Sequence, residues 1–94
     1  RFAYGQEIGL EDLSRVEKAE DFIRSLGSKM VRVRHYQLPD KTLLARIEVD
    51  AQDIERVNSH KSQVTSRLKE LGYNYVTLDL EGYRSGSMNA GIKR

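Results

Sequence analysis

Three arginines in two short stretches of the sequence could bind an anion. Arg32 and Arg34 occur in "VRVRH" (31–35), and Arg46 occurs in "ARIEV" (45–49). A guanidinium group donates parallel hydrogen bonds to two oxygens of a phosphate or carboxylate, so arginines are common in sites for these groups. Because arginine alternates with aliphatic residues here, a strand would present the arginines on one face and the aliphatic residues on the other. The three arginines are therefore candidate ligands of a phosphate or a carboxylate.

A fourth arginine lies in "GYRSGSMN" (82–89), a stretch rich in glycine and serine. Such residues can direct backbone N–H groups and hydroxyls toward a phosphate, to which Arg84 would add its charge and Ser85 and Ser87 their hydroxyls. The stretch is not a Walker motif, and loops of glycine and serine are common. Residues 81–94 are therefore interpreted either as a Gly/Ser-rich loop that binds an anion or as a flexible C-terminal tail.

Two amphipathic helices and three strands would position these residues. Apolar residues recur at steps of three and four over Leu10–Leu26 and over Ser59–Leu71, which predicts a helix in each segment, and Gly27 and Gly72 suit the helix ends. Alternation of apolar and polar residues predicts strands over Met30–Tyr36, Leu43–Val49 and Tyr75–Leu80. The turn "LPDK" between the first two strands predicts an antiparallel hairpin, with Asp40 bonding to its own backbone.

These elements predict a two-layer α+β sandwich in the order α-β-β-α-β. Two helices with one apolar stripe each can cover the aliphatic face of a three-stranded sheet that contains the hairpin. Residues 1–94 suffice for a single small domain. The other face of the sheet would carry Arg32, Arg34, Tyr36, Arg46, Glu48, Tyr75, Thr77 and Asp79. Its charges could pair across strands as a solvated surface, or its arginines could converge on an anion.

Composition limits the classes of protein that the chain can represent. Its 16 basic and 14 acidic residues give a net charge of +2, which is too even to indicate a nucleic-acid-binding protein. The sequence has no cysteine, which excludes a disulfide, a thiolate metal site and a thiol nucleophile within it. No apolar run approaches the length of a membrane span. We expect a cytoplasmic protein that binds neither nucleic acid nor a membrane.

The remaining polar residues suggest less chemistry. His35 and His60 are single and far apart in the sequence, too few for a zinc site, so no metal site is predicted. The acidic residues Glu17, Glu20 and Asp21 could flank a site, or they could form the solvent-exposed face of the first helix. No Ser/His/Asp arrangement with a known spacing is present. No catalytic residue is predicted from these patterns.

Four stretches of the sequence resemble, in the same order, the C-terminal region of the LarE family. They are "RFAYG" (1–5), "VRVRH" (31–35), "ARIEV" (45–49) and "LGYNYVTLDLEGYRSGSMN" (71–89). LarE proteins are ATP-dependent sacrificial sulfur transferases of the PP-loop (ATP pyrophosphatase) superfamily. The resemblance covers essentially the whole chain, and its last stretch is the most specific. The sequence departs from the family pattern at Ala3, Tyr36 and Ala90 and in a longer hairpin loop, and Ala90 puts a carboxylate role at that position in doubt.

The resemblance implies a division of labour in a longer protein. In the family, an N-terminal PP-loop domain binds ATP with magnesium and adenylylates a carboxylate of a pyridinium mononucleotide. The C-terminal region supplies sulfur, from a cysteine that becomes dehydroalanine in one branch and through an iron–sulfur cluster in another. The product lies on the path to the nickel-pincer nucleotide cofactor of lactate racemase. The PP-loop signature is absent here, and the family's cysteine would lie a few residues before Arg1, so we expect a C-terminal domain that binds no cofactor and is inactive alone.

The resemblance also implies which residues of this chain hold the substrate. A phosphate or carboxylate of a phosphorylated mononucleotide would lie near Arg84, with the sheet arginines assisting and with Glu20 and Asp79 as acidic neighbours. Partners would be the N-terminal PP-loop domain of the same full-length chain and further copies of the protein, since the family forms homo-oligomers. The alternative is a non-catalytic α+β module whose polar face or strand edges mediate oligomer assembly.

Overall fold

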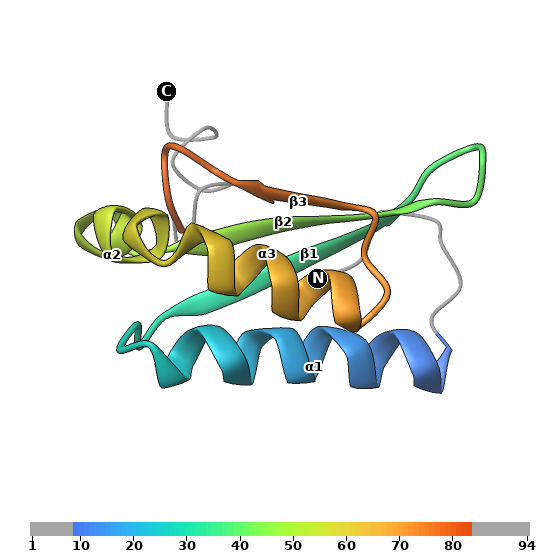
Figure 1. The fold of residues 1–94 in the computed structure, drawn as a ribbon, viewed down its shortest axis with the longest axis horizontal. Helices are drawn as coiled ribbons and strands as arrows, with labels where there is room; N and C mark the ends of the chain where they lie inside the picture. The colour runs from blue at the N-terminus through green and yellow to red at the C-terminus, as the bar shows by residue number, and fades with distance from the viewer. Residues whose placement is uncertain (1–8, 84–94) are drawn as a thin grey trace, which may run out of the picture.

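The computed structural model describes residues 9–83 as two layers, with helices on one side of a sheet (Figure 1). The elements in chain order are α1 (Leu10–Ser25), β1 (Val31–Gln37), β2 (Leu43–Val49), the 3-10 turn η1 (Ala51–Asp53), α2 (Ile54–Ser59), α3 (Lys61–Glu70) and β3 (Tyr75–Leu78). The predicted α+β class and the order α-β-β-α-β are confirmed. The last predicted strand ends at Leu78 rather than Leu80.

The sheet is mixed, with strand order β1-β2-β3. β1 and β2 form the predicted antiparallel hairpin, whereas β3 runs parallel to β2 on its other side. The parallel pairing follows from the connection, because α2 and α3 return the chain to the end of the sheet at which β2 begins. The register places Arg34 opposite Arg46, and Arg46 opposite Thr77.

The core lies between the sheet and the two longer helices, α1 and α3, which run side by side beneath the sheet in Figure 1. Its fully buried side chains come from one stripe of each helix and from alternate strand residues: Val16, Ala19, Ile23, Val31, Val33, Ala45, Ile47, Val49, Val64 and Leu68. The valines of "VRVRH" therefore face the helices, as predicted. Their burial turns the alternating arginines to the opposite face of the sheet.

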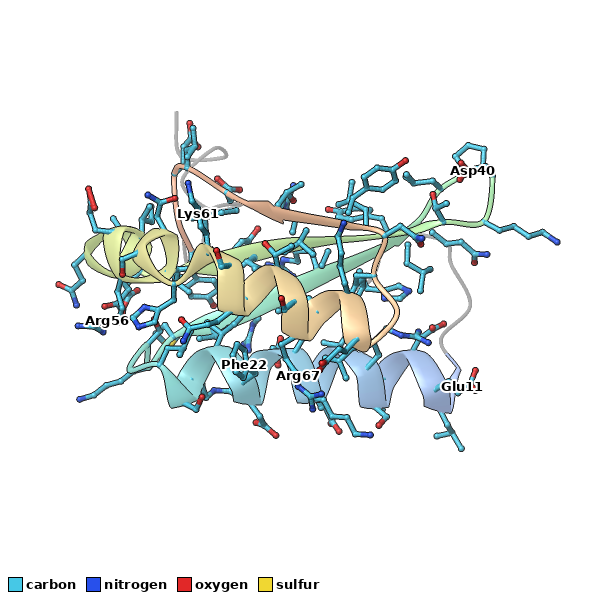
Figure 2. The ribbon with its side chains drawn as sticks, in the orientation of Figure 1. Glu11, Phe22, Asp40, Arg56, Lys61 and Arg67 are labelled. Atoms are coloured by element: carbon cyan, nitrogen blue, oxygen red, sulfur yellow. The ribbon has the colours of Figure 1, made fainter. Side chains whose placement is uncertain are left out.

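The hairpin loop shows the predicted aspartate turn. Asp40 lies in the loop between β1 and β2 (Figure 2), and its Oδ1 accepts a hydrogen bond from the backbone N–H of Thr42 at 3.0 Å. The Thr42 hydroxyl donates to the same oxygen at 2.6 Å. Lys41 adopts a positive φ of 72°, which an unbranched side chain tolerates in a tight turn. The loop thereby closes the two strands in the observed register.

Glu20 corrects one expectation, because it does not lie on a solvent-exposed helix face. Its side chain is fully buried, and its Oε2 accepts a hydrogen bond from the backbone N–H of Val33 at 2.9 Å. Val33 lies on the outer edge of β1, where no further strand is present in the described part of the chain to accept this N–H. α1 thus covers the strand edge and supplies the missing acceptor. Arg24 Nη2, 3.7 Å from Glu20 Oε1, adds a partly exposed positive charge.

After β3 the chain continues along β2 in an irregular way. The N–H of Asp79 donates to the carbonyl of Ile47 at 2.9 Å, and the N–H of Tyr83 donates to the carbonyl of Val49. Between them, Gly82 has a φ of 83°, and a β-carbon added there would lie 2.7 Å from the Val49 oxygen. Only glycine allows this approach. It brings Tyr83 onto the face of the sheet that lacks helices.

Candidate anion-binding face of the sheet

The face of the sheet that is turned away from α1 and α3 carries the candidate site, and we call it the open face. The strand register arranges its side chains in rows across the sheet. The aromatic row is Tyr36, Leu44 and Tyr75; the arginine row is Arg34, Arg46 and Thr77; and the third row holds Arg32 and Glu48. Asp79 and Tyr83 follow β3 at the end of the third row.

Glu48 organises the arginine row. Its Oε1 accepts a hydrogen bond from Arg34 Nε at 3.2 Å, and its Oε2 accepts one from Arg46 Nη2 at 2.8 Å. The carboxylate is 7% exposed, whereas the side chains of Arg34 and Arg46 are 34% and 41% exposed. Because the register places two like charges directly opposite each other, the buried carboxylate offsets their repulsion and fixes both guanidinium planes.

Arg46 makes further contacts that hold it in place. Its guanidinium lies 5.7 Å from the ring centre of Tyr36, a cation–π distance, and its Nε is 3.8 Å from Asp79 Oδ2. That Nε is buried and has no hydrogen-bond partner among residues 9–83. Thr77, the neighbour of Arg46 on β3, donates its hydroxyl to the carbonyl of Ala45 at 2.8 Å. Arg46 is therefore fixed at the boundary between the arginine row and the aromatic row.

Arg32 differs from the other two arginines. Its guanidinium lies 5.6 Å from the ring centre of Tyr83, and no ion pair joins it to a carboxylate within residues 9–83. Tyr83 reaches it because the Gly82 turn returns the chain to β2. No carboxylate of the described residues therefore neutralises Arg32.

The open face has positive charge and N–H donors beyond those that Glu48 and Asp79 engage in the described residues. Among residues 9–83, the three arginines face two carboxylates, Glu48 and Asp79, so one positive charge is left over in this part of the chain. A guanidinium carries five N–H donors, and the bonds to Glu48 use one nitrogen of Arg34 and one of Arg46. The remaining donors belong to half-exposed side chains. Within the described residues, the arginine row therefore presents donors that the bonds to Glu48 do not use.

The structure brings some of the predicted site residues together and separates others. Arg32, Arg34, Arg46 and Asp79 share the open face. Glu20 lies apart from them, buried between α1 and the edge of β1. The predicted residues Arg84, Ser85 and Ser87 lie outside the described residues. Within residues 9–83, no group of three His, Cys, Asp or Glu side chains could hold a metal ion, and no helix is long and apolar enough to cross a membrane.

The sequence placed Glu48 on this face and left open that charges pair across the strands, and the structure shows Glu48 paired with Arg34 and Arg46. The sequence did not identify Tyr83 as part of the site. Its position depends on the left-handed turn at Gly82, which no spacing in the sequence specifies.

A second polar cluster joins β1, α1 and the loop between α3 and β3. The buried ring of His35 contacts the Tyr73 hydroxyl through Nδ1 at 2.9 Å, and its Nε2 lies 3.7 Å from Asp12 Oδ1. Arg15 donates to Asp12 at 2.6 Å and to the Leu71 carbonyl at 2.7 Å. Burial lowers the pKa of His35, with Asp12 partly opposing the shift, and burial raises the pKa of Tyr73. Both groups are therefore neutral near pH 7.

The chain matches one protein of named activity over most of its length. It is 40% identical over 89 residues to pyridinium-3,5-bisthiocarboxylic acid mononucleotide synthase of Lactiplantibacillus plantarum, which covers 95% of this chain and 30% of that protein. The chain is similar to this synthase. This similarity supports the resemblance to the LarE family that the four sequence stretches indicate.

Two further relatives are uncharacterized proteins. One, from Synechocystis, is 44% identical over 91 residues, which cover 95% of this chain and 32% of that protein. The other, from Methanocaldococcus jannaschii, is 34% identical over 85 residues, which cover 90% of this chain and 31% of that protein. The chain thus spans about a third of the length of the curated relatives it matches. No protein-family model matches it.

Proposed function

We propose that this chain is the C-terminal domain of a LarE-type sulfur transferase and that its open face positions the phosphorylated substrate. The observation that carries the proposal is the pair of arginines that Glu48 holds side by side, with donors to spare, on a half-exposed surface. The similarity to the synthase over 95% of the chain supports the reaction class. In this proposal the full-length protein makes a thiocarboxylate on the path to a nickel-pincer cofactor.

The arginine row would bind the substrate while the chemistry occurs elsewhere. Arg34 and Arg46 donate to oxygens of the phosphate or of the second carboxylate, and Glu48 keeps their guanidinium planes from turning away. Arg32 adds charge from the next row, and Asp79 limits the positive charge near Arg46. Binding of this kind fixes the distance between the activated carboxylate and the sulfur donor.

The proposal assigns activation and sulfur donation to other parts of the full-length protein. Activation of a carboxylate by ATP and magnesium requires a nucleotide site, which we assign to an N-terminal PP-loop domain. Sulfur donation requires a thiolate or a cluster held by thiolates. The sequence contains no cysteine, so we assign the donor to a cysteine or an iron–sulfur cluster held outside these 94 residues.

Titration with inorganic phosphate tests the binding role. We expect phosphate to shift the backbone amides of Arg34 and Arg46, and we expect Arg34→Ala to weaken binding by about fivefold or more, since one charge-assisted contact is lost. Arg67→Ala is the matched control, because Arg67 lies on α3 in the helix layer and pairs with the exposed Glu70 (Figure 2). An equal loss in both variants would contradict a site on the open face.

The same titration tests the predicted Gly/Ser-rich loop. If the loop contributes donors, phosphate also shifts the amides of Arg84, Ser85 and Ser87, and Arg84→Ala weakens binding. Binding also weakens as salt rises, because exposed charges are screened over about 10 Å at 0.1 M ionic strength. An unchanged titration with Arg84→Ala would assign residues 81–94 to a tail.

Activity separates the role of this chain from that of the full-length protein. Three proteins would be incubated with ATP, magnesium and the pyridinium mononucleotide: this chain, the full-length protein, and the full-length protein with Arg34→Ala. We expect thiocarboxylate only from the intact full-length protein, with a strong reduction in the variant. Thiocarboxylate formed by this chain alone would refute the proposed division of labour.

An assembly module is the second candidate function, and one observation favours it. Within residues 9–83, β3 pairs only with β2, so its outer edge is available to a strand of another copy. An assembly module would change its size with protein concentration and would not respond to phosphate. The two functions are compatible, because the strand edge and the arginine row are different surfaces.

A further inference from the structure

A small apolar pocket lies on the helix-facing side of β3, between that strand, α2 and α3. We propose that this pocket binds the alkyl group of a short monocarboxylic acid whose carboxylate contacts Lys61. The site is separate from the proposed function, because the ligand contacts none of the arginines of the open face.

The pocket exists because the helix layer does not fully cover β3. Val76 and Leu78 pack against the core on the helix side, yet both are only half-buried, whereas Ile47 beside Leu78 on β2 is fully buried. α2 ends at Ser59 and α3 begins at Lys61, and residues on both sides of this break form the other wall. Aliphatic surface that a fold leaves half-covered is available to an apolar ligand. The aliphatic lining consists of Ile47, Val57, Val64, Val76 and Leu78.

The volume of the pocket limits the size of the alkyl group. A dry cavity of about 150 Å³ with an apolar lining binds benzene. The pocket beside β3 measures about 80 Å³, roughly half of that volume, which leaves room for a branched alkyl group of about three or four carbons. Full burial of each such carbon strengthens binding about fourfold, so the length of the alkyl group should decide the affinity.

The rim of the pocket favours a negatively charged head group. Lys61, the first residue of α3 (Figure 2), lies at the rim with the exposed neutral residues Asn58 and Thr65, and no carboxylate lines the pocket. Within residues 9–83, Lys61 forms no ion pair with another side chain. An ammonium group donates charge-assisted hydrogen bonds to a carboxylate, and amide and hydroxyl groups can donate further ones. One alkyl group beside one positive charge matches a short carboxylic acid.

Nuclear magnetic resonance titration of this chain tests both halves of the ligand with acetate, isovalerate, isovaleramide and inorganic phosphate. We expect isovalerate to bind about tenfold more tightly than acetate, because a half-open pocket buries its additional carbons only in part. Isovaleramide carries the same alkyl group without the charge and should bind about threefold more weakly than isovalerate, the effect of one exposed ion pair. Both isovaleryl compounds should shift the methyl groups of Val57, Val64 and Leu78, which phosphate leaves unchanged.

Variants of Val76 test the alkyl half of the site. Val76→Phe should fill the pocket and weaken isovalerate binding by about tenfold or more, while the phosphate titration of the open face stays unchanged. Phenylalanine is well tolerated in strands, and Val76→Ile guards against unfolding because it adds a single carbon. Val76→Ile should weaken isovalerate binding by a smaller factor.

A variant of Lys61 tests the charged half. Lys61→Gln should remove the preference for isovalerate over isovaleramide and leave the affinity for isovaleramide unchanged. Lys69→Gln is the matched control, because Lys69 is an exposed residue of the same helix that does not line the pocket. The control should keep the threefold preference.

The outcomes separate this inference from the proposed function. Equal affinity for acetate and isovalerate, or unchanged isovalerate binding in Val76→Phe, would overturn the alkyl pocket. Isovalerate shifts that disappear in Arg34→Ala would assign the carboxylate to the open face instead. Tighter binding of a short peptide that ends in leucine than of isovalerate would assign the pocket to a peptide C-terminus. Each of these results leaves phosphate binding at the arginine row to be decided by its own titration.

Discussion

At the scale of single residues, Glu48 is the side chain on which the open face depends. It is a buried carboxylate that contacts two half-exposed cations, and both of its oxygens are used. Without it, the strand register would place Arg34 and Arg46 opposite each other with nothing to offset their repulsion. Glu48 therefore holds the two guanidinium groups side by side.

Glu48→Gln tests whether the carboxylate positions the arginines or only neutralises them. The change adds one positive charge to the face, so a simple charge argument predicts tighter phosphate binding. We expect the opposite, a several-fold weaker affinity, because the guanidinium planes lose their common anchor. The free energy of unfolding should fall by about 1–2 kcal/mol, since two charge-assisted hydrogen bonds to partly exposed partners are weakened.

Phosphate titration and urea denaturation measure the two effects. Glu55→Gln is the matched control, because Glu55 lies exposed on α2 and its replacement removes the same charge from the chain. The control should leave the unfolding free energy within experimental error. Tighter phosphate binding in Glu48→Gln would show that Glu48 acts through charge alone.

At the scale of elements, α1 does more than cover the sheet. It places Glu20 beside the outer edge of β1, where the carboxylate accepts the N–H of Val33. An edge strand with unpaired N–H groups is a site for unwanted pairing, and a helix that supplies an acceptor removes part of that hazard. The contact also links the first element of the chain to the strand that carries Arg32 and Arg34.

Glu20→Ala and Glu20→Gln separate the parts of this contact. Glu20→Ala leaves a buried N–H without an acceptor, so we expect the free energy of unfolding to fall by about 2–4 kcal/mol. Glu20→Gln keeps an oxygen at the same place and should cost less than half as much. Urea denaturation measures both values. Equal losses would show that the charge of Glu20, rather than its hydrogen bond to Val33, stabilises the edge.

The helices and strands could be predicted because their spacing of apolar and polar residues excludes other registers. In "VRVRH", a shift of one residue would bury two arginines and expose two valines, so the register follows from the sequence. The position of Glu20 lies on the apolar stripe of α1, four residues after Val16 and three before Ile23, so periodicity alone would bury it. Its hydrogen-bond partner could not be predicted, because the N–H that Glu20 accepts belongs to a strand edge that exists only after β1 pairs with β2.

The site was predictable to a similar extent. Arg34 and Arg46 could be placed on one face because alternation specifies faces, but their common partner required the pairing of β1 with β2. The contact between Arg32 and Tyr83 depends on the turn at Gly82, where the chain passes close to the Val49 carbonyl. Sequence patterns specify which way a side chain points, and they do not specify which loops return to it.

At the scale of the whole molecule, the cluster around His35 joins parts of the chain that are far apart in sequence. His35 belongs to β1, Asp12 and Arg15 to α1, and Tyr73 to the loop between α3 and β3. Arg15 also binds the Leu71 carbonyl at the end of α3. In a neutral His35 ring that carries its hydrogen on Nε2, Nδ1 accepts a hydrogen bond from the Tyr73 hydroxyl. The Nε2 hydrogen then points toward Asp12. The cluster therefore fixes both helices to the sheet.

This cluster predicts a fall in stability in mild acid. Burial lowers the pKa of His35 in the folded protein, so between that value and the usual 6.5 the unfolded chain binds a proton that the folded chain does not. As far as His35 is concerned, the free energy of unfolding is therefore highest above about pH 7. It decreases as the pH falls through 6.5, by at most about 1.4 kcal/mol per pH unit for one proton. Asp12 reduces the effect without reversing it, because burial is the larger cause.

Urea denaturation between about pH 5.5 and pH 7.5 checks this prediction, above the range in which ordinary carboxylates titrate. His35→Gln should flatten the dependence on pH even if it lowers stability throughout, because the readout is the slope and not the absolute value. His60→Gln removes the only other histidine of the sequence and should keep the slope of the original protein. If His35→Gln retained the slope, another group would have to bind the proton on unfolding, and the neutral state of His35 would not be the cause of the lower stability in acid.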